Sequence, residues 1–322
     1  MKITYLLLLS AFLSLSVSCR KDRDAEPSKK SHRIKQVLLS DKSNYEYEKL
    51  DFLYDGDKLV SITNNLKDNS GSWVVEEKIE ISYSGDNILE TGYENVAGNL
   101  EIGAKSEYVV QNGLMMEELY YILKGGTWVK DNKCSYQYSG TDITAWQSYN
   151  DENNDGILEQ NGKGEYAYQD GKLSEYKNYK KDGYGSWYQD NKTTFVYEGN
   201  KLISWIDHKP DGSQGWLNNV KVEFLYSGDY VLQRDIFWWY SALNIWKSLG
   251  SRLYSFNSDG YLIEESEVEG NKMTCEYEEG SGNATCFFYR PEDLVYGEPT
   301  FKSTDQYRLI NHIPYYKRLK FR

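Results

Sequence analysis

The sequence has 322 residues, of which 37 are Lys or Arg and 49 are Asp or Glu, so its formal net charge is −12. Affinity for nucleic acids comes from neutralised phosphates, and a chain this acidic is therefore not expected to bind DNA or RNA. Aromatic residues make up 15% of the chain, which argues against disorder although the mean hydropathy is −0.72.

The N-terminus has the features of a lipoprotein signal. Lys2 provides a positive start, an apolar run covers residues 5–15, and small residues directly precede Cys19. This arrangement resembles a bacterial lipobox, in which the signal peptide is removed and the Cys is lipidated, although Ser16 stands where the pattern prefers Leu. We predict a signal peptide over residues 1–18, lipidation of Cys19 and hence a membrane partner; an ordinary cleaved signal peptide is the alternative.

The next segment, residues 19–33, is polar, mixed in charge and free of aromatics, which predicts a flexible tether. Together with the lipid it predicts a cell-envelope protein held at the outer membrane, on either the periplasmic or the surface face. A repeat domain is expected over residues 34–289, and a segment without the repeat over residues 290–322.

Internal repetition dominates residues 34–289. An aromatic or aliphatic anchor is followed shortly by Gly and then by an aliphatic residue, as in Tyr54, Gly56 and Leu59. Successive anchors are 27 to 30 residues apart, and they are Tyr54, Tyr83, Val110, Tyr138, Tyr168, Tyr197, Tyr226 and Phe256.

A second anchor stands ten residues before the first, as Trp in five repeats and Leu in two. An even spacing puts two residues on the same face of a strand, so both anchors are expected on one buried face. Alternation of apolar and polar residues between Trp216 and Tyr226 supports this interpretation. The Trp anchors, interpreted as core or repeat-stacking residues, are Trp73, Trp128, Trp187, Trp216 and Trp246.

Each repeat thus predicts two strands joined by a tight turn in which Gly permits a positive φ, followed by a looser polar loop. Eight such repeats of about 29 residues predict an all-β antiparallel meander of roughly sixteen strands. Strand twist curls a sheet of this length, and closure removes its exposed edges. We therefore predict a sheet that is curled or closed into a barrel-like form; an extended ribbon is the alternative.

Residues 54–63, YDGDKLVSIT, resemble the YD (Rhs-type) repeat, whose copies build large β-shells but are shorter than the unit in this chain. By pattern and composition, residues 45–290 are more similar to the Tyr-rich repeat lipoproteins of Bacteroidetes-type bacteria, a family of unknown function with a porin-like β fold. That resemblance implies a β fold and an envelope location, and it brings no established activity or catalytic residues.

Residues 151–159 form the candidate metal site. Oxygen-bearing side chains stand at positions 1, 3 and 5 and Gly156 at position 6, as in the first half of a Ca²⁺ loop. Position 12 is Gly162 instead of a bidentate Glu. Calcium is the candidate cofactor, and an ordinary turn between strands is the alternative. The proposed ligands are Asp151, Asn153, Asp155 and Glu159.

Another group of aromatic residues lies on the predicted second strands and departs from the repeat pattern. Trp238 and Trp239 are consecutive, so one of them uses the face opposite the core or a partner surface. Exposed Trp and Tyr beside Asp and Asn suit sugar rings and their hydroxyls. The predicted set for a glycan or protein ligand is Trp205, Trp238, Trp239 and Tyr240; packing against the C-terminal segment is the alternative.

Cys275 and Cys286 flank a predicted hairpin loop, and a symmetric count places them opposite each other across the strands. In an oxidising compartment this arrangement predicts a disulfide, with two buried free thiols as the alternative. Cys134 has no evident partner and is expected in the core.

No catalytic motif is found. The three His residues are scattered, and the sequence has no nucleophile elbow, zincin helix or phosphate loop. We therefore predict a lipid-anchored, extracytoplasmic, non-catalytic binding or scaffold module. A purely structural envelope protein is the alternative. A glycan-active hydrolase is the third hypothesis, and it requires two carboxylates that converge in a cleft, one of them with a raised pKa.

Overall fold

The computed structural model describes residues 32–279, apart from residues 57, 113, 152–154, 214, 229, 259–261 and 268–269. The predicted signal peptide, Cys19 and the C-terminal segment lie outside the described residues. No helix in the described part is long and apolar enough to cross a membrane. The eighteen strands are β1 (His32–Ser40), β2 (Glu46–Asp55), β3 (Lys58–Lys67), β4 (Trp73–Ser84), β5 (Asn87–Val96), β6 (Asn99–Gln111), β7 (Leu114–Lys124), β8 (Thr127–Ser139), β9 (Asp142–Asn150), β10 (Glu159–Gln169), β11 (Lys172–Lys181), β12 (Trp187–Glu198), β13 (Lys201–Pro210), β14 (Trp216–Ser227), β15 (Tyr230–Tyr240), β16 (Ile245–Phe256), β17 (Leu262–Glu267) and β18 (Lys272–Glu279).

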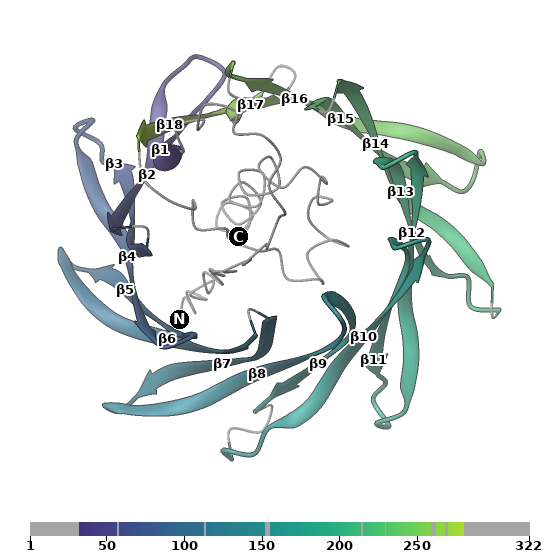
Figure 1. The fold of residues 1–322 in the computed structure, drawn as a ribbon, viewed down its shortest axis with the longest axis horizontal. Helices are drawn as coiled ribbons and strands as arrows, with labels where there is room; N and C mark the ends of the chain where they lie inside the picture. Colours follow the sequence, from purple (N-terminus) through teal and green to yellow (C-terminus); the bar gives the residue numbers. More distant parts are fainter. Residues whose placement is uncertain are drawn as a thin grey trace, which may run out of the picture.

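The strands form one closed antiparallel barrel. Each strand pairs with its neighbours in the sequence, and β1 also pairs with β18, so the strands follow one another around a complete ring (Figure 1). The prediction of an all-β meander that is curled or closed into a barrel-like sheet is confirmed, and the structure shows the closed form. The eight repeats correspond to β2–β17, and the two additional strands, β1 and β18, come from the two ends of the described chain.

The additional strands form a ninth repeat that is split between these ends. Tyr277 of β18 pairs with Ile34 of β1, as Tyr54 pairs with Leu59 inside the first repeat. Lys35 is left unpaired directly after Ile34, and Val60 is left unpaired directly after Leu59. The barrel therefore closes with the same pairing and the same unpaired residue that form the hairpin of the first repeat.

A β-bulge recurs three residues after the second anchor of every repeat. In β14, Val220 pairs with Asp207 and Asn218 pairs with His208, which leaves Asn219 as an extra residue. One extra residue shifts the alternation of side chains by one. Trp216 and Tyr226 therefore lie on opposite faces despite their even spacing, and the prediction that the two anchors share a face is wrong.

Aliphatic anchors and other buried side chains of the strands form the core on the inner face of the barrel, and the anchor Tyr rings pack against it. Leu59, Tyr108, Tyr176 and Leu262 are almost completely buried. Side chains converge on the concave face of a closed sheet and diverge on its convex face, so this burial identifies the inner face. Cys134 is buried there, as predicted.

The tight turns lie at one end of the barrel, which we call the turn end. Consecutive repeats are joined there by the hydroxyl of an anchor Tyr, because Tyr83 Oη donates to the Leu59 carbonyl at 2.6 Å and Tyr226 Oη donates to the Leu202 carbonyl at 2.8 Å. The Lys201 ammonium also donates to the Gly228 carbonyl in the next turn.

The connections at the other end, which we call the loop end, are more compact than the predicted loose loops. In four of them the Oδ1 atom of an Asp accepts backbone N–H groups two and four residues later, as in an Asx turn. These residues are Asp41, Asp68, Asp182 and Asp211.

Trp146 of β9 lies across β10 on the inner face. Its Nε1 atom donates to Tyr176 Oη of β11 at 3.0 Å. A Cβ atom added at Gly164 of β10 would stand 2.0 Å from Trp146 Nε1, so the indole occupies space that only Gly leaves free. The hydrogen bond from Trp146 of β9 to Tyr176 of β11 thus depends on a Gly in the intervening strand.

Replacing Gly164 with Ala is expected to displace the Trp146 indole and destabilise the barrel by about 1–3 kcal/mol, the usual cost of overpacking. Urea unfolding of the mature chain measures this change. Gly183→Ala is the control, because a Cβ atom at Gly183 meets nothing within 4 Å, and it should change stability by less than about 0.5 kcal/mol. Equal stabilities of the two variants would contradict the packing argument.

Candidate functional site

The bulges place the five Trp anchors on the outer face, at the starts of β4, β8, β12, β14 and β16. Each of these strands follows a connection at the loop end, so the five rings lie near that end of the barrel. All five are half-buried. We call this set the Trp belt: Trp73, Trp128, Trp187, Trp216 and Trp246.

Every ring of the Trp belt is contacted by a Lys of the preceding repeat. In that repeat the Lys stands five residues after the position of the second anchor and five residues before the first anchor. The Nζ atom of Lys192, for example, lies 5.1 Å from the Trp216 ring centroid, within cation–π range. The Nζ–centroid distances for the other pairs are 5.5 Å for Lys49 and Trp73, 5.5 Å for Lys105 and Trp128, 5.4 Å for Lys163 and Trp187, and 5.3 Å for Lys221 and Trp246.

Lys105 and Lys221 are also held by a carboxylate and a second ring. Lys105 Nζ is 2.8 Å from a Glu107 oxygen and 4.3 Å from the Tyr121 centroid, and Tyr121 Oη donates to Glu107 at 2.9 Å. Burial raises the pKa of Tyr121 to about 12, and the hydrogen bond to Glu107 adds to this shift. Burial opposes ionisation of Glu107, but the bonds from Lys105 and Tyr121 hold its pKa below the usual range.

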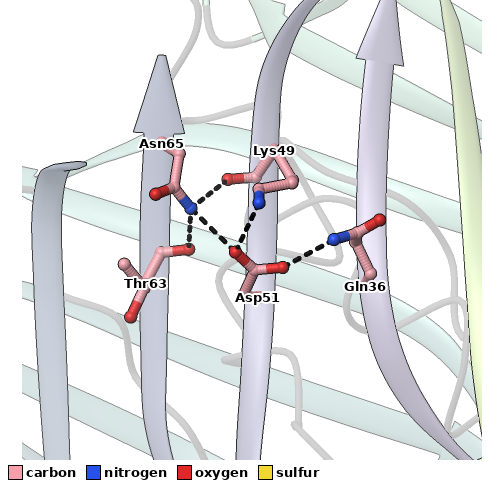
Figure 2. A network of polar contacts seen from close by, with 5 residues as sticks. All are labelled: Gln36, Lys49, Asp51, Thr63 and Asn65. Carbon is pink, nitrogen blue, oxygen red and sulfur yellow. Dashed lines mark hydrogen bonds and ion pairs between the residues drawn. The ribbon is translucent and has the colours of Figure 1, made fainter. Parts of the chain in front are cut away.

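The first repeat has an Asp where four other repeats have this Glu, and its network crosses the seam at which the barrel closes. Asp51 of β2 accepts a hydrogen bond from Gln36 of β1 at 2.6 Å and from Asn65 of β3 at 3.0 Å, and it pairs with Lys49 at 3.0 Å. Figure 2 shows these side chains over three adjacent strands, with other strands of the barrel behind them. The outer polar network is thus continuous across the split repeat.

The predicted aromatic ligand residues do not form one surface. Trp205 is 4% exposed on the inner face, so it offers no ring to a ligand outside the barrel. Trp239 lies on the outer face, where it contacts Trp246 edge-on at 4.9 Å between centroids. Trp238 and Tyr240 lie on the opposite face at the loop end, and Lys247 Nζ stands 3.9 Å from the Tyr240 centroid.

Asp151, the first residue of the predicted calcium site, also accepts backbone N–H groups of its loop, but from donors four and five residues later. Its two carboxylate oxygens accept the backbone N–H groups of Asp155 and Gly156, each at 3.0 Å. Asn153 lies outside the described residues, and Glu159 begins β10. Within the described ranges, no three His, Cys, Asp or Glu side chains are grouped to hold a metal. Calcium binding stays a prediction.

The predicted disulfide also remains open. Cys275 is buried in β18, and burial raises the pKa of its thiol to about 12. Cys286 lies outside the described residues, so the pairing stays a prediction.

The Lys ladder was missed by the sequence analysis, although the signal was present. Once the repeats are aligned on their first anchors, seven of the eight repeats have a Lys five residues before that anchor. These residues, the Lys ladder, are Lys49, Lys78, Lys105, Lys133, Lys163, Lys192 and Lys221. A recurring charged residue at one repeat position indicates a recurring contact on the outer face.

Carboxylates gather on the inner face at β2, β4 and β5. Glu77 of β4 stands directly opposite Glu94 of β5 in the strand register. The pKa of Glu77 is raised to about 7, mainly by burial and to a smaller extent by the negative charges of Glu94, Glu76 and Glu48. This environment favours the protonated form of the Glu77 carboxyl.

Because the pKa of Glu77 is about 7 in the folded state and near its ordinary value of 4.5 when unfolded, folding favours the protonated form. Its contribution to stability is complete below pH 4.5 and is lost as the pH rises towards 7. Glu77→Gln should therefore stabilise the protein little at pH 5 and by up to about 3 kcal/mol at pH 8. Urea unfolding at both pH values measures this, with Glu198→Gln at an exposed turn as control; equal effects of Glu77→Gln at the two pH values would contradict the assignment.

No family model and no curated protein matches the chain. Similar solved structures include a porin-like protein from Bacteroides uniformis, with 10% identity and a TM-score of 0.40, covering 76% of this chain and 98% of that chain. A porin-like protein from Bacteroides vulgatus has 12% identity and a TM-score of 0.37, with 77% and 99% covered. A protein of unknown function from Bacteroides fragilis has 14% identity and a TM-score of 0.34, with 38% and 92% covered. Similarity at this level assigns no function to the chain.

Proposed function

We propose that this protein is a lipid-anchored, non-catalytic binding module of the cell envelope and that its Trp belt binds an extended glycan. The observation that carries the proposal is the regular placement of half-buried rings on the outer face. Trp187, Trp216 and Trp246 stand at the starts of β12, β14 and β16. Alternate strands of a sheet are about 10 Å apart, so these rings recur at that interval around the barrel.

A surface that repeats at a fixed interval suits a ligand that also repeats. Trp rings present flat apolar faces to sugar rings, and the neighbouring Lys and Glu side chains can donate to and accept from hydroxyl groups. Each ring alone binds weakly, but several rings that engage one polymer multiply their effect through a high local concentration. The lipobox at Cys19 supports the envelope location.

A purely structural role is the second candidate, and one observation favours it. The Lys residues of the ladder are already engaged by groups of the same chain; Lys221, for instance, contacts Glu223 at 2.7 Å and lies over both Phe237 and Trp246. In this case the belt stabilises the barrel wall and binds no ligand.

A glycan array screened with residues 20–322, with Ca²⁺ and with EDTA, provides the first test. A length series of the best glycan should then bind more tightly as the chain grows. Trp187→Ala and Trp216→Ala should each weaken binding of the longest member roughly two- to tenfold, the value of one stacked ring. Binding lost in EDTA would add support for the loop at Asp151.

Tyr184→Ala is the matched control, because Tyr184 is a 97% exposed aromatic at the loop end that lies outside the belt, and it should leave binding unchanged. Thermal melts of all variants separate lost binding from lost folding. A blank array with a folded protein, or equal losses in Tyr184→Ala and Trp187→Ala, would leave the structural role as the better account.

A further inference from the structure

Three glutamates of neighbouring strands form a row on the inner face of the barrel, towards its loop end. Glu77 of β4 stands opposite Glu94 of β5, and Glu94 also stands opposite Glu101 of β6. Within the residues that the structure describes, none of these three carboxylates takes part in an ion pair or a hydrogen bond. Like charges directly opposite each other destabilise a sheet, so this row is a feature that the barrel wall alone does not balance.

A buried amide continues the row on β3. Asn64 stands directly opposite Glu77, so its side chain lies next to that carboxylate on the same face. Asn64 is 8% exposed, and its Oδ1 atom is buried without a hydrogen-bond partner. A buried acceptor without a donor is unusual in a folded protein, and this atom therefore indicates a ligand that supplies the donor.

Negative charge and aliphatic side chains surround the row. The pKa of the Glu94 carboxyl is raised, mainly by burial and also by the negative charge of Glu76. Val74 of β4 and Val96 of β5 lie on the same face nearer the loop end, where they are 40% and 45% exposed. A ligand at this place meets hydrogen-bond acceptors, negative charge and aliphatic surface together.

The arrangement of these groups favours an extended organic cation. The carboxylates follow one another along a line across adjacent strands, and the outer two stand on alternate strands, about 10 Å apart. A linear polyamine has several ammonium groups, which donate hydrogen bonds and accept none, joined by short aliphatic chains. It matches a line of acceptors with aliphatic surface beside it better than a single ion does.

We propose that the inner face at β3–β6 binds a linear polyamine, with ammonium groups on the carboxylates of Glu77, Glu94 and Glu101 and a hydrogen bond to Asn64 Oδ1. The bound cation offsets the repulsion between the opposed carboxylates and satisfies the buried amide. Barrels of this strand number are wide enough to leave an interior channel. The site lies on the face opposite the Trp belt, so it is independent of glycan binding.

Calorimetric titration of residues 20–322 with spermidine tests this proposal, at pH 8 because the pKa of Glu77 is about 7. Spermidine should bind, and butylamine, which has a single ammonium group, should bind at least about tenfold more weakly. Glu77→Gln/Glu94→Gln should weaken spermidine binding at least about tenfold, because charge-assisted hydrogen bonds are lost. Asn64→Leu should weaken it severalfold without a change of charge.

The matched control is Asp86→Asn/Glu198→Gln, which removes the same charge from two exposed turns at the opposite end of the barrel. It should bind spermidine like the unmodified chain. Thermal melts should show both double variants folded, because loss of Glu77 and Glu94 relieves a repulsion. Absence of spermidine binding to the unmodified chain would overturn the proposal, as would equal losses in the two double variants.

Two competing occupants have distinct outcomes. Displacement of spermidine by an equal concentration of Ca²⁺ would identify a metal site and overturn the polyamine assignment. The C-terminal segment, which lies outside the described residues, is the other competitor because its last residues are basic. Spermidine binding that appears only after these are changed to Gln would identify that segment as the occupant and overturn the proposal. The residues to change are Lys317, Arg318, Lys320 and Arg322.

Discussion

The pairing of β1 with β18 is the contact on which the rest of the barrel depends. Tyr277 and Ile34 supply the two anchors of one repeat from opposite ends of the described chain, and Arg33 extends the join into the next repeat by donating to the Gly56 carbonyl and lying 4.4 Å from the Tyr54 centroid. Without this pairing, β1 and β18 would be exposed edges, because β1 already pairs with β2 on its other side. Every other repeat finds its partner next to it in the sequence.

The architecture was predictable because each repeat contains its own strand pair, turn and anchors. The assignment of faces was not, because it depends on bulges whose residues share no chemical character. In β4, β6, β8 and β16 the extra residue is Glu, Gly, Asp and Leu, respectively: Glu76, Gly103, Asp131 and Leu249. Periodicity of two assumes an uninterrupted strand, and one extra residue moves every later side chain to the other face. Closure was also not specified by the sequence, because the halves of the ninth repeat are separated by more than 200 residues.

The candidate site was predictable to a smaller extent. Consecutive Trp238 and Trp239 had to use opposite faces, and they do. The burial of Trp205 could not be predicted from its own strand, because it depends on Phe195 of β12 and Val222 of β14, which stand opposite Trp205 on the two neighbouring strands. The Trp belt depends on contacts between neighbouring repeats, which only an alignment of the repeats on their anchors would have revealed. The Trp rings on the outer face each contact a Lys of the preceding repeat.

The split repeat also determines the order in which this fold can be completed. Hairpins from β2 to β17 join residues close in sequence and can form early, whereas the Arg33 and Glu278 side chains that meet at 2.6 Å are 245 residues apart. Closing so long a loop is entropically unfavourable and slow relative to hairpin formation. One edge of β1 therefore stays unpaired until the whole domain has been synthesised, and the incomplete barrel has an exposed strand edge on each side until β18 is in place. A chaperone that covers these strand edges would act in that interval, before the barrel closes.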